Sequence, residues 1–116
     1  MKKQPSIFTD PMLSIVVPVH NEAEVIPDLL ARLDLVSRQL EDAVELLFVD
    51  DGSQDNSVAL LMQARHRQPA IRVVQLSRNF GKEAAVTAGL EHARGDAVVL
   101  MDADLQDPPE LIPSMV

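Results

Sequence analysis

A dense group of acidic side chains follows one apolar run of the sequence. The segment VVLMDADLQDPPE leads from apolar residues into Asp102, Asp104, Asp107 and Glu110. Carboxylates at this spacing repel one another and raise one another's pKa, so they need either water or a cation among them. Such oxygen ligands suit Mg²⁺ or Mn²⁺, which bind through one or two carboxylates and complete their shell with phosphate oxygens and water. Gln106 offers a further neutral oxygen.

Two more polar segments, PVHNE and VDDGS, follow apolar runs in the same manner. Each by itself is most simply a solvated loop with helix-capping acids, but three acidic segments at one rim of a sheet weaken that interpretation. Asp50 is the better candidate for ligand contact, and Asp51 before Gly52 suits a turn-capping role. Glu22 is equally suited to accepting from a ribose hydroxyl and to starting a helix, where an acid offsets the dipole.

Other residues that carry chemistry give weaker signals. Lys82, beside Gly81, is long enough to reach a phosphate, although a solvated lysine at a helix start is the ordinary alternative. The three histidines show no metal-ligand spacing. Neither G-x-G-x-x-G nor G-x-x-x-x-G-K-[ST] occurs, and G-x-S-x-G is also absent, so the dinucleotide, P-loop and nucleophile-elbow interpretations fail.

The elements that must position these residues alternate between apolar runs and helical patterns, a β-α-β-α rhythm. The predicted strands cover residues 13–19, 44–50, 71–77 and 96–104, and the helical patterns cover 21–40, 54–68, 79–95 and 108–116. Right-handed crossovers then give an α/β fold with a mostly parallel sheet and helices on both faces, in which ligands bind at the carboxyl ends of the strands. A last strand that runs through Asp104 would place Asp102 and Asp104 on the same side.

Local signals predict where the helices begin and end. Asn21 is the expected N-cap of the first helix, with Pro27 in its first turn. Ser53 or Asp55 is the expected cap of the second helix. The third helix is rich in small residues, which favours close packing, and is expected to end at Gly95.

Composition narrows the class of protein. The 116 residues fit one small domain with an ordinary globular composition, 47% hydrophobic and 24% charged. A net charge of −8 argues against a nucleic-acid partner, and the lack of cysteine excludes disulfides and thiolate metal sites. Residues 1–12 lack the apolar region of a signal peptide and are expected to form a leader before a domain at 13–116. No run approaches the roughly 18–20 apolar residues of a membrane span.

Four segments in order carry a resemblance to a known family: SIVVPVHNE, LLFVDDGSQDNS, LSRNFGKEAAVTAGLEHARGD and VVLMDADLQDPPE. Together they resemble the family 2 glycosyltransferases with a GT-A fold, a Rossmann-like nucleotide-diphospho-sugar transferase architecture. The likeness is greatest to the subgroup that moves a sugar from a nucleotide-sugar to a polyprenyl or dolichyl phosphate. It covers nearly everything from Leu13 onward.

The resemblance implies roles for individual residues. Pro18, His20 and Glu22 would line the base and ribose of a nucleotide, and Asp50 would meet the base side of the pocket. Asp102 and Asp104 would form the catalytic motif, in which Asp102 serves the nucleotide diphosphate and Asp104, with Gln106, holds Mg²⁺ or Mn²⁺. A divalent cation and a diphosphate among the carboxylates would explain why they tolerate one another. The partners implied are a nucleotide-diphosphate sugar and a polyprenyl-phosphate acceptor. His20 replaces the aromatic residue often found there.

The resemblance covers only the N-terminal portion of such enzymes, which continue well past the metal motif. We therefore expect the chain to be the nucleotide-binding half of a glycosyltransferase, inactive and prone to form homo-oligomers when alone, and cytoplasmic, with full-length relatives at the cytoplasmic face of the membrane. A non-enzymatic nucleotide-binding module is the alternative. A receiver-like phosphoacceptor domain is less favoured, because its acid pair should follow the first strand rather than the second.

Overall fold

The computed structural model describes residues 12–40, 43–104 and 109–112. The described strands are β1 (Met12–Val19), β2 (Ala43–Asp50), β3 (Ile71–Gln75) and β4 (Ala97–Leu100). The helices are α1 (Ile26–Gln39), α2 (Ser57–Arg67), α3 (Lys82–His92) and the short 3₁₀-helix η1 (Pro109–Leu111). Of the predicted leader, residues 1–11 lie outside the described residues, and Met12 already belongs to β1.

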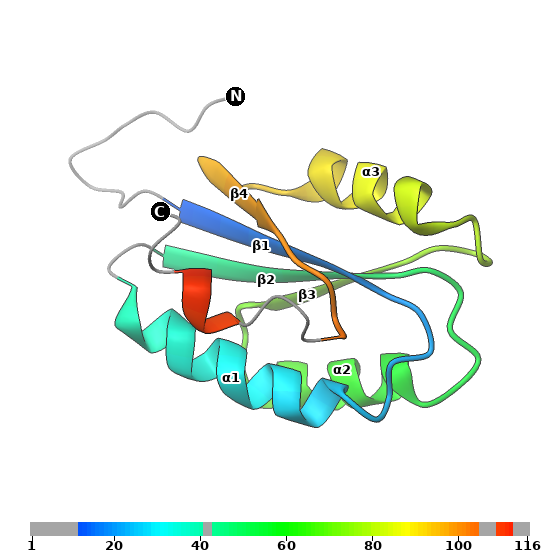
Figure 1. Cartoon of the computed structure of the whole chain (residues 1–116), viewed down its shortest axis with the longest axis horizontal. Helices are drawn as coiled ribbons and strands as arrows, with labels where there is room; N and C mark the ends of the chain where they lie inside the picture. The colour runs from blue at the N-terminus through cyan, green and yellow to red at the C-terminus, as the bar shows by residue number, and fades with distance from the viewer. Residues whose placement is uncertain (1–11, 41–42, 105–108, 113–116) are drawn as a thin grey trace.

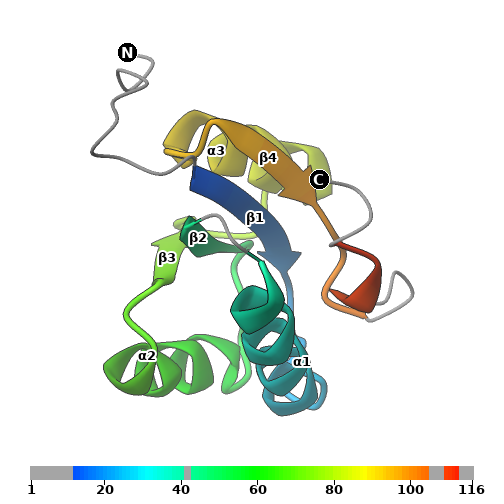
Figure 2. The same cartoon turned by 90° about the vertical axis from the view of Figure 1, so that its left-hand side faces the viewer.

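The strands form one sheet in the order β3-β2-β1-β4, and every neighbouring pair is parallel. Helices α1 and α2 cover one face of this sheet and α3 covers the other (Figures 1 and 2). The predicted α/β fold with a parallel sheet and helices on both faces is therefore confirmed. Because α1 leads from β1 to β2 on one face and α3 leads from β3 to β4 on the other, the strand order reverses beside β1. Such a reversal opens a crevice at the carboxyl ends of the two central strands.

The apolar core lies in two layers, because successive side chains of each strand point to opposite faces. Ile15 and Val17 of β1 and Phe48 of β2 belong to the larger layer, which α1 and α2 cover. Val16 belongs to the smaller layer under α3. The predicted close packing of the third helix is confirmed at Gly89, where an added Cβ would lie 2.4 Å from Cγ1 of Val16.

The start of α1 differs from the prediction. Asn21 is not its N-cap; the helix begins at Ile26 after Val25, without a side-chain cap, and Pro27 lies in its first turn as expected. Asn21 instead has a positive φ of 52°, and its Oδ1 accepts the backbone N–H of Gln54 at 2.8 Å. Its side chain therefore ties the loop after β1 to the loop after β2.

The ends of α2 and α3 also correct the predicted signals. The N-cap of α2 is Asn56, so neither Ser53 nor Asp55 holds that position. Asp55 still accepts the backbone N–H of Ser57 at 2.9 Å, whereas Ser53 accepts the N–H of Asn21 at 2.8 Å. Helix α3 ends at His92, so Gly95 is not its C-terminal signal. Gly95 is required for close approach, since an added Cβ would lie 2.6 Å from the hydroxyl of Ser14.

The fourth strand ends at Leu100 and does not run through Asp104, so the predicted shared strand face of Asp102 and Asp104 is wrong. The N–H of Met101 still donates to the carbonyl of Val16 at 3.0 Å. In a parallel ladder the next bond would come from the N–H of residue 18, which is proline and has none. The chain after Met101 is thereby released into a turn.

In the described sheet β4 is an edge strand, and its Val98 and Leu100 are exposed. Exposed apolar residues on an unpaired edge favour association between chains, so the predicted homo-oligomer remains a prediction with a physical basis. Within the described ranges, no helix has the length and apolar character needed to span a membrane.

Candidate functional site

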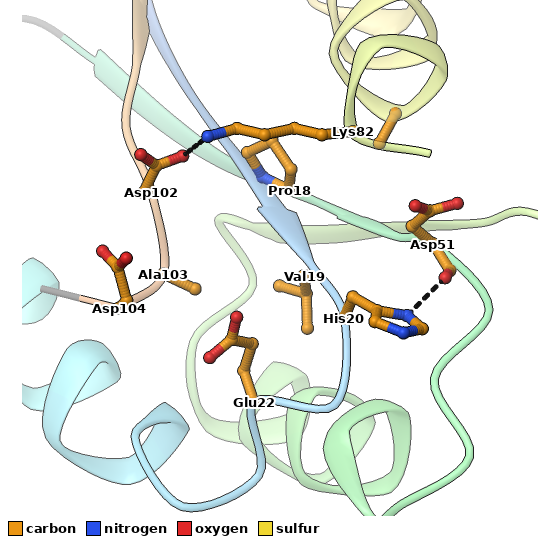
Figure 3. A pocket seen from close by; sticks show the side chains of 10 residues that line it. Pro18, Val19, His20, Glu22, Asp51, Lys82, Asp102, Ala103 and Asp104 are labelled. Carbon is orange, nitrogen blue, oxygen red and sulfur yellow. Dashed lines mark hydrogen bonds and ion pairs between the residues drawn. The ribbon is translucent and has the colours of Figure 1, made fainter. Parts of the chain in front are cut away.

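A pocket of about 150 Å³ lies at the reversal of strand order, where the chain leaves β1 and β4. It is formed by the ends of these two strands, the residue after β2 and the first turn of α3 (Figure 3). The residues that line it are Pro18, Val19, His20, Glu22, Asp51, Lys82, Ala85, Asp102, Ala103 and Asp104. Pro18, His20, Glu22, Asp102 and Asp104, all predicted from the sequence, are thus brought together.

Three carboxylates crowd this pocket. Asp102 and Glu22 are half-buried, Asp104 is exposed, and the three approach it from the loops after β4 and β1 (Figure 3). Burial raises the pKa of Glu22 above its ordinary value of 4.5, and the negative charges of Asp104, Asp55 and Asp102 raise it further. The folded chain therefore places the charges of Asp102 and Asp104 close enough to Glu22 to disfavour its ionised form.

Lys82 is the cation that meets these acids. Its Nζ lies 2.5 Å from Oδ1 of Asp102, and the two side chains are 63% and 37% exposed. Figure 3 shows the lysine stem crossing above Pro18 to reach Asp102. The sequence predicted that the Lys82 side chain either reaches a phosphate or lies in solvent, and it did not predict this ion pair. The signal that was available is that the third helix starts at the same sheet edge at which the fourth strand ends.

Asp51 fixes the start of α3 rather than the turn at Gly52. Its buried carboxylate accepts the backbone N–H groups of Phe80 at 2.8 Å and Gly81 at 3.1 Å. Its carbonyl oxygen accepts Nδ1 of His20 at 2.7 Å. Because a carbonyl can only accept, Nδ1 of a neutral His20 carries the proton, which leaves Nε2 as the acceptor. Asp51 thus holds both His20 and the helix that carries Lys82.

Asp50, the stronger candidate of the acidic pair, lies on the other face of the sheet. It is fully buried and follows Phe48 by two residues, on the side covered by α1 and α2. Its Oδ2 accepts the N–H of Ser53 at 3.1 Å, while its Oδ1 has no hydrogen-bond partner among the described residues. Asp50 does not line the pocket. Its contact with a nucleotide therefore stays a prediction.

A second, polar hollow adjoins the pocket at His20, which lines both. It is formed by the loops after β1, β2 and β3, and besides His20 its walls are Asn21, Gly52, Ser53, Gln54, Gln75, Leu76, Ser77, Arg78 and Asn79. The guanidinium of Arg78 stacks over the ring of Phe80 at 4.6 Å from its centroid. The hollow is rich in amide, hydroxyl and backbone groups that can donate and accept hydrogen bonds.

The carboxylates of the pocket are suitable ligands for a divalent cation whose remaining ligands are phosphate oxygens. Within the described ranges, no three His, Asp or Glu side chains form a complete metal cluster. Mg²⁺ usually takes only one or two carboxylates and fills its shell with phosphate oxygens and water, so Asp102 and Asp104 are the residues that could hold it. Asp102 already has a cationic partner in the ammonium of Lys82. The predicted ligand Gln106 lies outside the described residues.

Comparison with curated proteins finds glycosyltransferases among the similar sequences. The chain is 50% identical over 103 residues to the uncharacterized glycosyltransferase YkcC of Bacillus subtilis, covering 89% of this chain and 32% of YkcC. It is 47% identical over 118 residues to the undecaprenyl-phosphate 4-deoxy-4-formamido-L-arabinose transferase of Pseudomonas fluorescens, covering 100% of this chain and 33% of that protein. The chain therefore spans about a third of the length of these relatives.

Solved structures give the same fold. The mannosyltransferase PcManGT of Pyrobaculum calidifontis, in complex with GDP-Man and Mn²⁺, matches 87% of this chain and 34% of its own with a TM-score of 0.73 and 26% identity. TarS residues 1–349 of S. aureus, in complex with UDP-GlcNAc, matches 80% of this chain and 26% of its own with a TM-score of 0.66 and 27% identity. The family model described as "Glycosyl transferase family 2" matches residues 14–116. The chain belongs to glycosyl transferase family 2 and has its GT-A fold.

Proposed function

We propose that this chain is the part of a family 2 glycosyltransferase that binds a nucleotide-diphosphate sugar together with Mg²⁺ or Mn²⁺, for transfer to a polyprenyl phosphate at the cytoplasmic face of a membrane. The observation that carries the proposal is the pocket at the strand-order reversal, where Asp102 and Asp104 meet Glu22 and Lys82. The names of similar proteins support the ligand classes: one is an undecaprenyl-phosphate transferase, and one was solved with GDP-Man and Mn²⁺.

The two ends of the nucleotide would lie in different parts of the site. We infer that the diphosphate and the cation lie at Asp102 and Asp104, because carboxylates are the hard ligands present there. The nucleoside would extend past His20, toward the hollow lined by Ser77 and Asn79. Asn21 and Asn79 already place their amide groups 3.4 Å and 3.3 Å from Nε2 of His20. A base with donors and acceptors on its edge finds matching groups on these walls.

The protein's part in the reaction is to orient the bound nucleotide-sugar and to compensate the charge of the diphosphate. The divalent cation, when bound, stabilises the negative charge that develops on the leaving diphosphate. Asp102 and Asp104 hold that cation, and Pro18 and Ala103 are apolar residues of the pocket wall. A polyprenyl phosphate is already anionic, so its attack on the sugar needs no strong general base.

Calorimetry with UDP and GDP tests the proposal. At least one should bind more tightly with Mn²⁺ than with EDTA, and Asp104→Asn should remove most of that difference. Glu110→Gln is the matched control, since Glu110 is an exposed acid on η1 that pairs weakly with Arg32 at 3.9 Å and does not line the pocket. Equal affinity with and without metal would contradict the assignment.

Asp50 and the enzyme class need separate tests. Asp50→Ala should weaken nucleotide binding even in EDTA, because an acceptor for base or ribose is lost whichever ion is present. If Asp50→Ala weakened nucleotide binding with Mn²⁺ but not in EDTA, Asp50 would be assigned to the metal site instead. Nucleotide binding without sugar transfer, in the longest natural form of the protein, would favour a non-enzymatic binding module.

A further inference from the structure

The ion pair between Lys82 and Asp102 occupies the position at which the proposed cation would bind. Among the described residues that line the pocket, Lys82 is the one lysine or arginine. Its Nζ contacts Oδ1 of Asp102 at 2.5 Å, and this is the ion pair that the Asp102 carboxylate makes within the described residues. The ammonium therefore offsets part of the repulsion among Asp102, Asp104 and Glu22.

A divalent cation at the two aspartates would disfavour this ion pair. A doubly charged ion on Asp102 and Asp104 repels an ammonium at the same carboxylate and makes it unnecessary for charge balance. The side chain of Lys82 is 63% exposed on a flexible four-carbon stem, so it can leave Asp102 without unpacking the core. Its backbone stays in place, because Asp51 holds the preceding residues Phe80 and Gly81.

We propose that Lys82 is an exchangeable cation: it neutralises Asp102 while the pocket is empty and moves to an oxygen of the nucleotide diphosphate when metal and nucleotide bind. The inference rests on the proposed function and adds a residue to it. Lys82 competes with the metal at Asp102 and assists the diphosphate afterwards. Its removal should therefore change the two affinities in opposite directions, a result that a merely structural lysine would not give.

The test measures metal and nucleotide separately on Lys82→Met. Mn²⁺ titrated alone and followed by electron paramagnetic resonance should bind several-fold more tightly than to the wild type, since a competing charge is gone. UDP or GDP titrated at saturating Mn²⁺ should bind about tenfold more weakly, the effect of losing one charge-assisted hydrogen bond. Lys82→Arg should restore most of the nucleotide affinity.

Controls separate this inference from the proposed function. Arg65→Met removes one positive charge from the exposed surface of α2, away from the pocket, and should leave both affinities unchanged. If the wild type binds nucleotide with metal but Lys82→Met changes neither affinity, or lowers both, the exchange is wrong and the proposed function stands. If the wild type shows no metal-dependent nucleotide binding, the proposed function itself fails. A loss of farnesyl phosphate binding instead of nucleotide binding would assign Lys82 to the acceptor and overturn the inference.

Discussion

The two ends of α3 carry the same kind of interaction, a carboxylate paired with a cation, in opposite settings. At the start of the helix, Lys82 and Asp102 meet at an open pocket, and both are partly in solvent. At its end, Glu45 of β2 is 4% exposed and pairs with Arg72 of β3 at 2.6 Å. Both pairs lie on the α3 face of the sheet, roughly the length of the helix apart, about 16 Å for eleven residues.

The ion pair at the end of α3 is shielded from solvent and held by further hydrogen bonds. Oε2 of Glu45 accepts the hydroxyl of Ser14 at 2.5 Å and the N–H of Arg94 at 2.6 Å, and Arg72 donates to Oε1 and to the carbonyl of His92. Burial acts to raise the pKa of Glu45, but the hydrogen bonds from Ser14, Arg94 and Arg72 outweigh it and hold the pKa below 4.5. Every oxygen of this carboxylate has a partner within the chain.

The two ion pairs use charge for different purposes. A buried carboxylate that accepts three hydrogen bonds within the chain anchors the end of α3 and is closed off from a ligand in solvent. A partly exposed carboxylate with one mobile partner can exchange that partner. We therefore expect substitutions at the closed end to change stability and substitutions at the open end to change binding.

The largest expected effect is that of Glu45→Ala. Removing one partner of a buried, hydrogen-bonded ion pair leaves the charge of Arg72 without its carboxylate and the Ser14 hydroxyl without its acceptor, which should lower the free energy of unfolding by about 3–5 kcal/mol. Urea denaturation measures this loss. Nucleotide affinity of the fraction that stays folded should be unchanged. A decrease in the free energy of unfolding of less than about 1 kcal/mol would show that the end of α3 does not depend on these hydrogen bonds.

An intermediate effect is expected for Asp51→Ala, which should change both stability and nucleotide binding. The variant loses the acceptor for the N–H groups of Phe80 and Gly81, so stability should fall by about 1–2 kcal/mol. Because the same contact positions Lys82, nucleotide affinity should fall as well. Glu45→Ala, which removes the contact at the other end of α3, is the control that should lower stability without this loss of affinity.

The pH dependence of stability should distinguish Glu45 from Glu22 by sign. The pKa of Glu45 is lower in the folded chain than its ordinary value of 4.5, so its contribution is present above pH 4.5 and is lost as pH falls through the folded value. The pKa of Glu22 is raised, so its ionisation opposes folding and protonation relieves that cost. Glu45→Gln should flatten the acid limb of a stability curve, whereas Glu22→Gln should not.

The smallest effect on stability is expected for Asp104→Asn. Asp104 is exposed, and its charge raises the pKa of Glu22, so its loss removes repulsion. The free energy of unfolding should stay within about 0.5 kcal/mol of the wild type or rise slightly. Thermal denaturation without metal measures it. A marked destabilisation would mean that the open end is also a structural anchor.

The sequence predicted the sheet, its helices and the location of the site, because apolar periodicity and crossover rules decide these features. It did not predict the hydrogen bonds and close contacts between segments that are distant in the sequence. Asn21 has the residue type of an N-cap, yet its hydrogen bond to Gln54 is set by a loop distant in the sequence. Asp50 and Asp51 are adjacent in sequence but lie on opposite faces, so their roles depend on strand register. Gly95 follows a helix as a C-terminal glycine should, but it is needed against Ser14.

Paramagnetic broadening of amide resonances by Mn²⁺ in the presence of UDP or GDP locates the cation without reference to catalysis. We expect the resonances of Asp102, Ala103, Asp104 and Lys82 to broaden first, while those of Glu45 and Gly95 at the other end of α3 stay sharp. Broadening centred on the Glu45 end, or no broadening near Asp102 and Asp104 when nucleotide is bound, would contradict it.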